Sequence, residues 1–349
     1  MLQPLEKVLI ALVLTFSLFI ILTYLISMVL GILVVFSTVE GLTFSRTSIF
    51  LNPLLVIDIT LRVNAGVYFL FLWWVFALCF AAAWKYRESV PSKVRELFSG
   101  SSRTGIFANN LLAMPAVTSM LLVATLVLHL LQTGGGIPTG EPSSEGPFID
   151  FLRFSRAPLV EEILFRILPI GSFLVTYIFL LGKRLKPHWG RGQRLKIAFW
   201  SVFQPEKAKE QVGLRTITDA GLLNGLSGAE WVIVGFTAFV FGFAHYLGGW
   251  GAGKISQAAL SGVAFGLAYL YYGAQAPILF HWFFNYYFEA LDLSTGALQS
   301  SIDLVSLAEL ANLFLGMLLW VVAIIFALMT LLRVMRKKRQ VDPVGDQLS

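Results

Sequence analysis

The chain has 349 residues, and 26 Lys and Arg against 20 Asp and Glu give it a net charge of +6. Hydrophobic residues make up 57% of the chain and charged residues only 13%, whereas an average soluble domain carries about 25% charged residues. A soluble enzyme of this composition would expose too much apolar surface, so the composition predicts a polytopic membrane protein. The single cysteine, Cys79, excludes an intrachain disulfide and a cysteine-based metal site.

Eight apolar stretches are candidates for membrane-spanning helices, because a helix needs roughly 20 apolar residues to cross a bilayer. In chain order they are residues 8–36, 63–84, 106–132, 157–182, 230–247, 255–272, 276–291 and 307–332. The fifth, sixth and seventh stretches are short and contain polar residues, so we expect them to be shielded by the other helices, tilted, or partly interfacial. The sequence therefore predicts an all-α, polytopic transmembrane helical bundle of about eight spans.

The basic residues are distributed unevenly between the two ends of these spans. When successive loops are assigned to alternate sides, 20 Lys and Arg residues fall on one side and 5 on the other, and loop 183–229 alone contains nine. Basic residues collect in cytoplasmic loops, so we predict that both termini lie inside. Because organelle signals are absent, we expect an integral protein of the prokaryotic plasma membrane. Its expected surroundings are the lipid bilayer, without nucleic acid.

Two local patterns predict how helices make contact. Segment 193–203 mixes Arg and Lys with aromatic and aliphatic residues, which is typical of an amphipathic helix on an anionic leaflet; a solvated loop is the alternative. In the sixth span, Ala258, Gly262 and Gly266 recur at every fourth residue. Small residues at this spacing let helix backbones approach closely, and we expect that contact within the molecule rather than in a dimer.

The fourth span contains charges in its interior, namely Glu161, Glu162 and Arg166. Intramembrane charges are costly and indicate function by default. Glu162 and Arg166 are four residues apart and share a helix face, so they can neutralise each other. Glu161 is rotated about 100° away around the helix, which leaves its carboxylate free to face a reacting group. A purely structural ion-pair network is the alternative.

Two later spans contribute pairs of residues at the same four-residue spacing. Phe241 and His245 share a face of the fifth span, and His281 and Asn285 share a face of the seventh. A single buried histidine is also compatible with a hydrogen-bonded core position. Two polar side chains on one face of an aromatic helix are costly unless they are satisfied, and His and Asn donors suit an oxyanion hole.

Convergence of these side chains would assemble a site for peptide-bond hydrolysis. Glu161 and His245 would hold and activate a water molecule, and His281 and Asn285 would stabilise the tetrahedral intermediate. An ion- or proton-coupled transporter is the main alternative from another class, because intramembrane Glu, His and Arg also mark ion paths. A non-catalytic immunity or scaffold protein is a further alternative.

The order of the motifs resembles the CAAX protease and bacteriocin-processing family of intramembrane endopeptidases, also named CPBP or Abi, and its type II CAAX prenyl proteases. The resemblance consists of three motifs, EExxxR, FxxxH and HxxxN, and extends over roughly residues 155–291. In this chain the motifs fall on Glu161, Glu162, Arg166, Phe241, His245, His281 and Asn285.

The resemblance implies a site inside the membrane in which Glu161 and His245 activate water and His281 and Asn285 stabilise the oxyanion. It also implies that the substrate is a membrane protein or lipidated peptide that is cut near its C-terminus. We expect a glutamate-dependent mechanism without a cofactor. Zinc is the alternative, because Glu161, His245 and His281 would form a His₂Glu site, although the HExxH motif is absent.

The resemblance also suggests a division of the chain. Residues 1–147 would form the first three spans and their loops. Residues 148–291 would form the catalytic core, including the basic cytosolic loop 183–229, and residues 292–349 the last span and a polybasic tail.

Overall fold

The structure is a computed structural model that describes residues 4–51, 61–86, 89–99, 105–140, 144–185, 189–297 and 303–341. The helices are α1 (Pro4–Ser37), α2 (Val39–Ser45), α3 (Ala65–Lys85), α4 (Val90–Ser99), η1 (Gly105–Ala108), α5 (Asn110–Gly134), α6 (Pro147–Glu162), η2 (Ile163–Ile167), α7 (Leu168–Leu185), α8 (Arg191–Phe203), α9 (Pro205–Val212), α10 (Ile217–Gly225), α11 (Gly228–Leu247), α12 (Gly253–Tyr272), α13 (Gln275–Trp282), η3 (Phe283–Tyr287), α14 (Phe288–Ala297) and α15 (Leu304–Val341). One antiparallel hairpin, β1 (Ser48–Leu51) with β2 (Leu61–Asn64), is the only sheet in these ranges. The predicted all-α bundle is confirmed.

Helices occupy all eight predicted spans. Six of them, formed by α1, α3, α5, α6 to α7, α11 and α15, are long and apolar enough to cross a membrane. The remaining two are α12 and the continuous helix from α13 to α14. These two are shielded as predicted, since Tyr269, Leu279 and Trp282 are fully buried. The protein is therefore an integral membrane helical bundle.

The fifth span is shielded by other helices on one face only. Helix α11 exposes Val232, Phe236 and Phe239, each by more than half of its surface. The outward face of α11 is apolar and can contact lipid directly, while its polar residues turn inward. A short span thus needs shielding only on the face that carries its polar groups.

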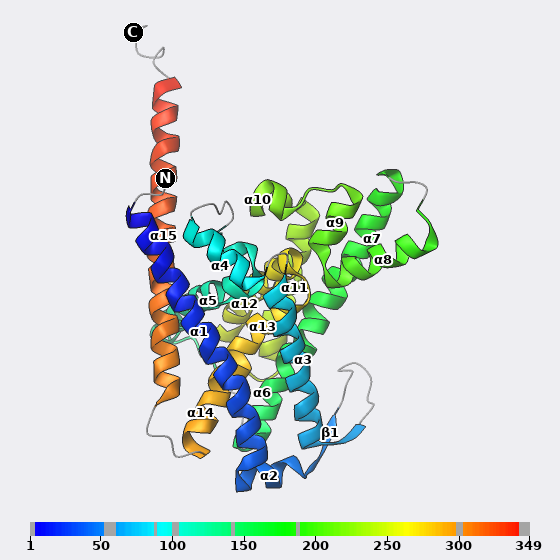
Figure 1. The fold of residues 1–349 in the computed structure, drawn as a ribbon, viewed down its shortest axis with the longest axis vertical. Coiled ribbons are helices and arrows are strands. Elements are labelled where there is room, and N and C mark those ends of the chain that lie inside the picture. The colour runs from blue at the N-terminus through cyan, green and yellow to red at the C-terminus, as the bar shows by residue number, and fades with distance from the viewer. Residues whose placement is uncertain are drawn as a thin grey trace.

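The start of α1 and the end of α15 lie at the same end of the bundle (Figure 1), in agreement with an even number of crossings. Helices α8, α9 and α10, which come from the basic segment 183–229, lie at that end as well, whereas α2 and β1 lie at the opposite end. Segment 193–203 is helical and exposes Leu195 and Phe199. Its contact with an anionic leaflet stays a prediction. Residues 342–349 of the polybasic tail lie outside the described residues.

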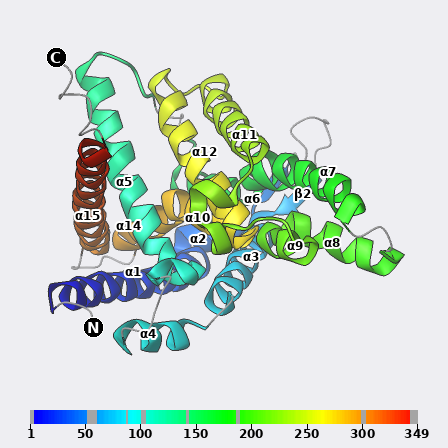
Figure 2. The same cartoon turned by 90° about the horizontal axis from the view of Figure 1, so that it is seen from above.

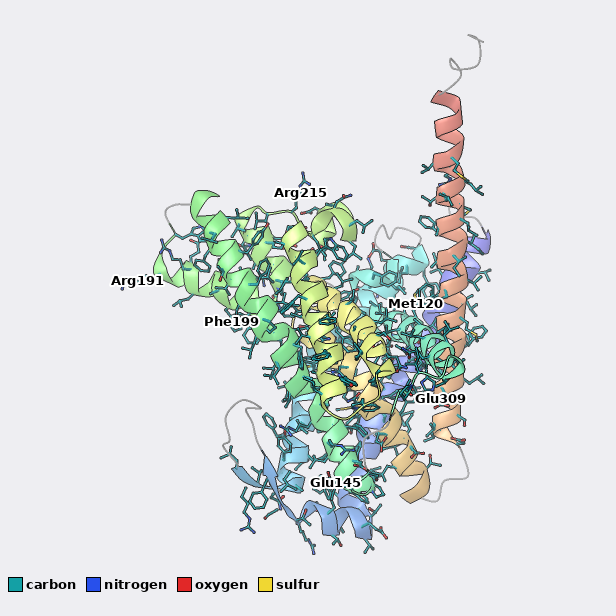
Figure 3. The ribbon with its side chains drawn as sticks, turned by 180° about the vertical axis from the view of Figure 1, so that it is seen from behind. Met120, Glu145, Arg191, Phe199, Arg215 and Glu309 are labelled. Atoms are coloured by element: carbon teal, nitrogen blue, oxygen red, sulfur yellow. The ribbon has the colours of Figure 1, made fainter. Side chains whose placement is uncertain are left out.

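Two views show how the helices surround the centre of the bundle. Seen from above, α15 lies at the rim beside α5 (Figure 2), and only 11% of its apolar stretch is buried. From behind, α11 and α12 occupy the middle of the molecule, between Arg215 towards one end and Glu145 towards the other (Figure 3). Helices α11 and α12 therefore lie at mid-height between the two ends of the bundle.

The fourth span begins at Pro147 rather than at residue 157 as predicted. Proline is favourable in the first turn of a helix, where its missing N–H is not needed. Arg153, which the sequence placed in a loop, is in α6 and its charge is compensated by Asp150 at 2.9 Å. Because the helix starts earlier and continues through η2 into α7, Glu161 lies well inside a long helix.

Helices α11 and α12 pack through small residues, as the spacing in the sixth span predicts. A Cβ atom on Gly262 would lie 2.9 Å from the Cα of Ala238, and one on Gly266 would lie 3.0 Å from Val234. From the other side, a Cβ on Gly242 would lie 2.2 Å from the carbonyl oxygen of Ile255. The small residues therefore serve contact within the molecule.

We predict that Gly242→Ala lowers the thermal unfolding temperature of the purified protein, because the added methyl group meets backbone that cannot move aside. Overpacking of this kind costs about 1–3 kcal/mol. Gly235→Ala in the same helix is the matched control, since nothing lies within 4 Å of its added Cβ, and alanine favours a helix by up to about 1 kcal/mol over glycine. Equal changes in both variants would contradict the packing described.

Candidate active site

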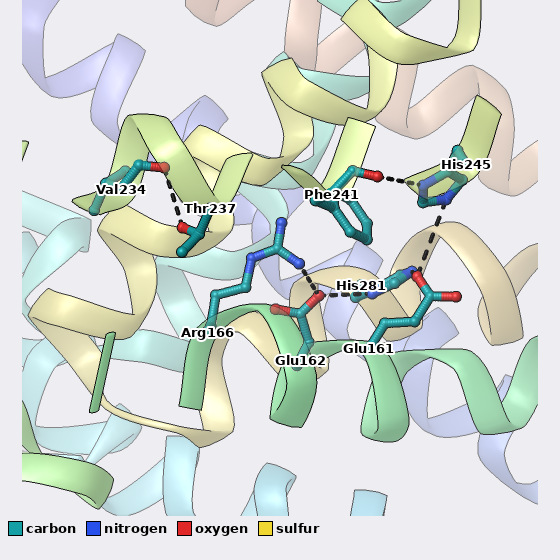
Figure 4. A network of polar contacts seen from close by, with 8 residues as sticks. All are labelled: Glu161, Glu162, Arg166, Val234, Thr237, Phe241, His245 and His281. Carbon is teal, nitrogen blue, oxygen red and sulfur yellow. Dashed lines mark hydrogen bonds and ion pairs between the residues drawn. The ribbon is translucent and has the colours of Figure 1, made fainter. Parts of the chain in front are cut away.

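Three helical segments bring the charged and polar motif residues together in the bundle core (Figure 4). Glu161 and Glu162 end α6, and Arg166 follows in η2. His245 lies near the end of α11, and His281 lies in α13. The predicted convergence of residues that are far apart in the sequence is thus present.

Glu162 accepts two hydrogen bonds on one carboxylate oxygen. Its Oε1 lies 2.9 Å from Nη1 of Arg166 and 2.7 Å from Nδ1 of His281. The side chains of Glu162 and Arg166 are fully buried. The predicted pairing of Glu162 with Arg166 is confirmed, and the structure adds His281 as a third member, which sequence spacing did not indicate.

The guanidinium of Arg166 also lies against aromatic rings. Its central carbon is 4.0 Å from the centre of the Phe241 ring and 5.4 Å from that of Phe265. A cation over an aromatic face is stabilised by the quadrupole of the ring, most strongly where water is excluded. Phe241 therefore supports the charge network from α11, which gives the phenylalanine of the second motif a physical role.

Glu161 faces away from Arg166 and towards both histidines. Its Oε2 lies 3.7 Å from Nε2 of His281 and 4.0 Å from Nε2 of His245. The Glu161 side chain is 29% exposed, whereas that of Glu162 is fully buried. The two adjacent carboxylates therefore occupy different environments, as the rotation around the helix predicts.

The hydrogen bonds of the histidines determine which ring nitrogen carries a proton. Nδ1 of His245 lies 2.9 Å from the carbonyl oxygen of Phe241, and a carbonyl oxygen only accepts, so Nδ1 donates. Neutral His245 then presents a lone pair on Nε2 to the side facing Glu161. Nδ1 of His281 donates to Glu162 in the same way, and both Nε2 atoms are directed at the Glu161 carboxylate.

The helices that carry the first and third motifs each contain a π-helical turn next to the site. Segment η2 directly follows Glu162 and contains Arg166, and segment η3 directly follows α13 and contains Asn285. Single π-helical turns inside α-helices occur frequently at functional sites. Because such a turn changes the angular step between residues, four-residue spacing alone does not determine where Asn285 lies relative to His281.

A cavity of about 680 Å³ opens beside Glu161, and a smaller hollow of about 140 Å³ adjoins it beside His281. Four residues line both, namely His245, Lys254, Phe284 and Asn285. Asn285 is thus brought to the same space as the two histidines. The cavity gives Glu161 and His245 access to a molecule from outside the core.

Sequence reasoning missed Lys254 and Trp250. The predicted spans placed Lys254 in a loop, but the residue lies in the first turn of α12 and lines both hollows. Trp250 lines the larger cavity, with its ring 6.3 Å from that of His245. No spacing rule links these positions to the motifs, since the turn between α11 and α12 determines where they lie.

The zinc alternative was tested on the positions of the candidate ligands. Glu161 Oε2 is 3.7 and 4.0 Å from the two histidine Nε2 atoms. Zinc ligands lie about 2.0–2.2 Å from the ion and close around it in a tetrahedron. Within the described ranges, no group of three His, Cys, Asp or Glu side chains is arranged to hold a metal ion. Two tetrahedral ligands at these bond lengths lie about 3.4 Å apart, so the three side chains are near one another but less close than in a formed His₂Glu site.

Fold and site together define an integral membrane protein with a carboxylate–histidine centre beside a cavity in its core. Residues 147–287 match a family model described as Type II CAAX prenyl endopeptidase Rce1-like. The matched segment covers less than half of the chain and contains the residues of all three motifs, and the match supports an intramembrane protease in general. Neither a curated protein nor a solved structure gives a significant match.

We predict that Arg166→Met destabilises the folded protein strongly, because Glu162 would lose its buried cation. Breaking a buried ion pair from one side costs about 3–5 kcal/mol. Arg194→Met on α8 is the control, since Arg194 is exposed and surface charges contribute only about 0–1 kcal/mol. Thermal unfolding in detergent measures both variants, and similar unfolding temperatures would contradict the role given to Arg166.

Proposed function

We propose that this protein is an intramembrane endopeptidase in which Glu161 and His245 activate water and His281 and Asn285 stabilise the oxyanion. The observation that supports this assignment is the approach of the Glu161 carboxylate to the Nε2 atoms of two histidines in a cavity wall. Buried Glu162 positions His281 through a hydrogen bond, and Arg166 neutralises the charge of Glu162 beside the site.

Water activation follows from the two acceptors that face each other. The Glu161 carboxylate and the lone pair on Nε2 of His245 both accept, and they are 4.0 Å apart. One water molecule can donate a hydrogen bond to each, because hydrogen bonds to oxygen and nitrogen are about 2.7–3.0 Å long. Oε2 of Glu161 is buried and has no hydrogen-bond partner among the described residues, so this atom is available as the base.

The reaction then proceeds by proton transfer and addition. The water oxygen attacks the peptide carbonyl carbon while its proton passes to the Glu161 carboxylate. The carbonyl oxygen becomes an oxyanion, which accepts hydrogen bonds from the Asn285 amide and from Nε2 of His281. His281 must carry both ring protons for this step, because Nδ1 already donates to Glu162.

Breakdown of the tetrahedral intermediate restores the site. The C–N bond breaks, and the proton held by Glu161 passes to the leaving amine. The products are a new carboxyl end and a new amino end, and Glu161 is again a carboxylate. The same side chain thus serves as base in the first step and as acid in the second.

The proposed substrate is a membrane-associated or lipidated protein that is cut near its C-terminus. The family description, a CAAX prenyl endopeptidase, supports this substrate class. The wall of the larger cavity includes Phe154, Phe165 and Phe288, and aromatic walls suit an apolar chain or lipid. The prokaryotic plasma membrane is the proposed location, with the bilayer as the route by which such substrates arrive.

We predict that Glu161→Gln lowers peptide cleavage at least about 100-fold, because loss of a general base typically costs 10²–10⁴ in rate. The assay uses detergent-purified protein and quenched peptides, including farnesylated CaaX tails and hydrophobic C-terminal helices. Glu289→Gln is the matched control, since Glu289 lines the same cavity and the ion pairs of the two histidines involve Glu161 and Glu162 instead. It should retain activity within a few-fold of wild type.

Two outcomes would contradict this proposal. Wild-type activity in the Glu161→Gln variant would remove Glu161 from the mechanism. Cleavage of no peptide by well-folded wild type, together with ion flux in vesicles, would favour a transporter.

The proposed mechanism needs no metal ion. We predict that cleavage by wild type is unchanged, within about twofold, after treatment with a strong zinc chelator, since Glu161 and His245 supply the base directly. Metal analysis of the same sample should find less than one zinc per protein. Loss of activity on chelation and its return with added zinc would instead assign Glu161, His245 and His281 as ligands.

A further inference from the structure

Lys254 stands out among the residues that line the cavity. It is half-buried and lines both the larger cavity beside Glu161 and the smaller hollow beside His281. His245 and Asn285, which belong to the proposed site, line the same two spaces. A cation is therefore present beside the centre, and the proposed mechanism does not use it.

Lys254 has no ion pair or hydrogen bond through its ammonium group among the described residues. Its Nζ lies 4.1 Å from the ring centre of Trp250, and the ammonium also interacts electrostatically, without a direct contact, with the Glu161 carboxylate. Two buried lysines elsewhere, Lys93 and Lys209, each contact a glutamate at 2.6 and 2.8 Å. A half-buried ammonium without a directly contacting carboxylate is costly, and the indole offsets only part of that cost.

A purely structural role does not explain this lysine. It is the second residue of α12, and positive charge is unfavourable in the first turn because the helix dipole is positive there. Lys254 therefore does not stabilise the helix on which it lies. An anion that enters the cavity would give this ammonium a direct ionic contact and would offset the unfavourable helix dipole.

The turn that carries Lys254 is held rigidly. The backbone N–H of Gly251 donates to Thr139 and that of Gly253 donates to Pro138, both at 2.9 Å. Gln132 of α5 also donates to the carbonyl of Gly253 at 2.9 Å. Lys254 and Trp250 are thus presented from a wall that is fixed before any ligand binds, which lowers the cost of binding.

The position of that wall favours a chain end as the anion. The Trp250 ring is 6.3 Å from the His245 ring and 4.1 Å from the Lys254 ammonium. Together these two distances mean that the His245 ring and the Lys254 ammonium are at most about 10 Å apart. Three extended residues cover this length, at roughly 3.4 Å each. A terminal carboxylate is the last group of the substrate chain, so the chain can stop at this wall. An acidic side chain would instead require the substrate chain to continue past the wall.

We propose that Lys254, packed on Trp250, binds the free C-terminal carboxylate of the peptide substrate and thereby places the cleaved bond a few residues from the chain end. This inference rests on the proposed endopeptidase function. Lys254 is a specificity-determining residue in this assignment, because it contacts the substrate away from the bond that is cut.

The test compares two peptides that differ only at the C-terminus, one with a free carboxylate and one with a carboxamide. The peptides are taken from the pool cleaved by wild type, and kcat and KM are measured for each in detergent. Wild type should cleave the acid about tenfold to hundredfold more efficiently than the amide, the range expected for one hydrogen bond to a charged group.

Lys254→Met should remove this preference by lowering kcat/KM for the acid alone, mainly through a higher KM, since the lost contact is present before the chemical step. Lys254→Arg should keep the preference because it keeps the cation. Lys207→Met is the matched control. Lys207 is exposed and lies over the ring of Trp200 at 4.5 Å, a similar contact away from the cavity.

Equal cleavage of acid and amide by wild type would overturn the inference and leave the endopeptidase in place. An equal loss on both peptides in Lys254→Met would also overturn it, because the lysine would then act on Glu161 or on the fold. Cleavage of neither peptide by well-folded wild type would overturn the endopeptidase function itself.

Discussion

The buried carboxylate of Glu162 is the interaction on which the rest of the core depends. One oxygen accepts hydrogen bonds from Arg166 and from His281, and so connects the fourth span to α13. The guanidinium in turn lies against Phe241 of α11 and Phe265 of α12. A buried charge is costly unless a partner of opposite charge compensates it. The need to compensate one carboxylate therefore brings four helical segments to one place.

The two neighbouring glutamates divide their roles because they point in different directions. Glu162 is enclosed and paired, which suits a residue that positions its neighbours. Glu161 is partly open to a cavity and faces the Nε2 atoms of two histidines. A base must reach its substrate and exchange protons with it, so it needs this opening. Adjacent positions on one helix thus provide a structural charge and a reactive one.

The rim of the site consists of elements outside the three motifs. Lys254 and Trp250 come from the turn between α11 and α12, and hydrogen bonds to Pro138 and Thr139 hold that turn in place. The two helices that this turn joins pack closely through Gly242 and Gly262. Backbone hydrogen bonds and close helix packing outside the motifs therefore support the wall that presents Lys254 to the cavity.

The sequence by itself determined the class of protein, the helical segments and the pairing of Glu162 with Arg166, because hydrophobic runs and four-residue spacing act within one helix. It also separated Glu161 from that pair. Only the tertiary structure decided that His281 completes the network, that the fourth span begins at Pro147, and that Lys254 lines the cavity. These features depend on contacts between segments that are distant in the chain, on a π-helical turn and on the turn between α11 and α12. The periodicity of residues within one helix encodes none of these.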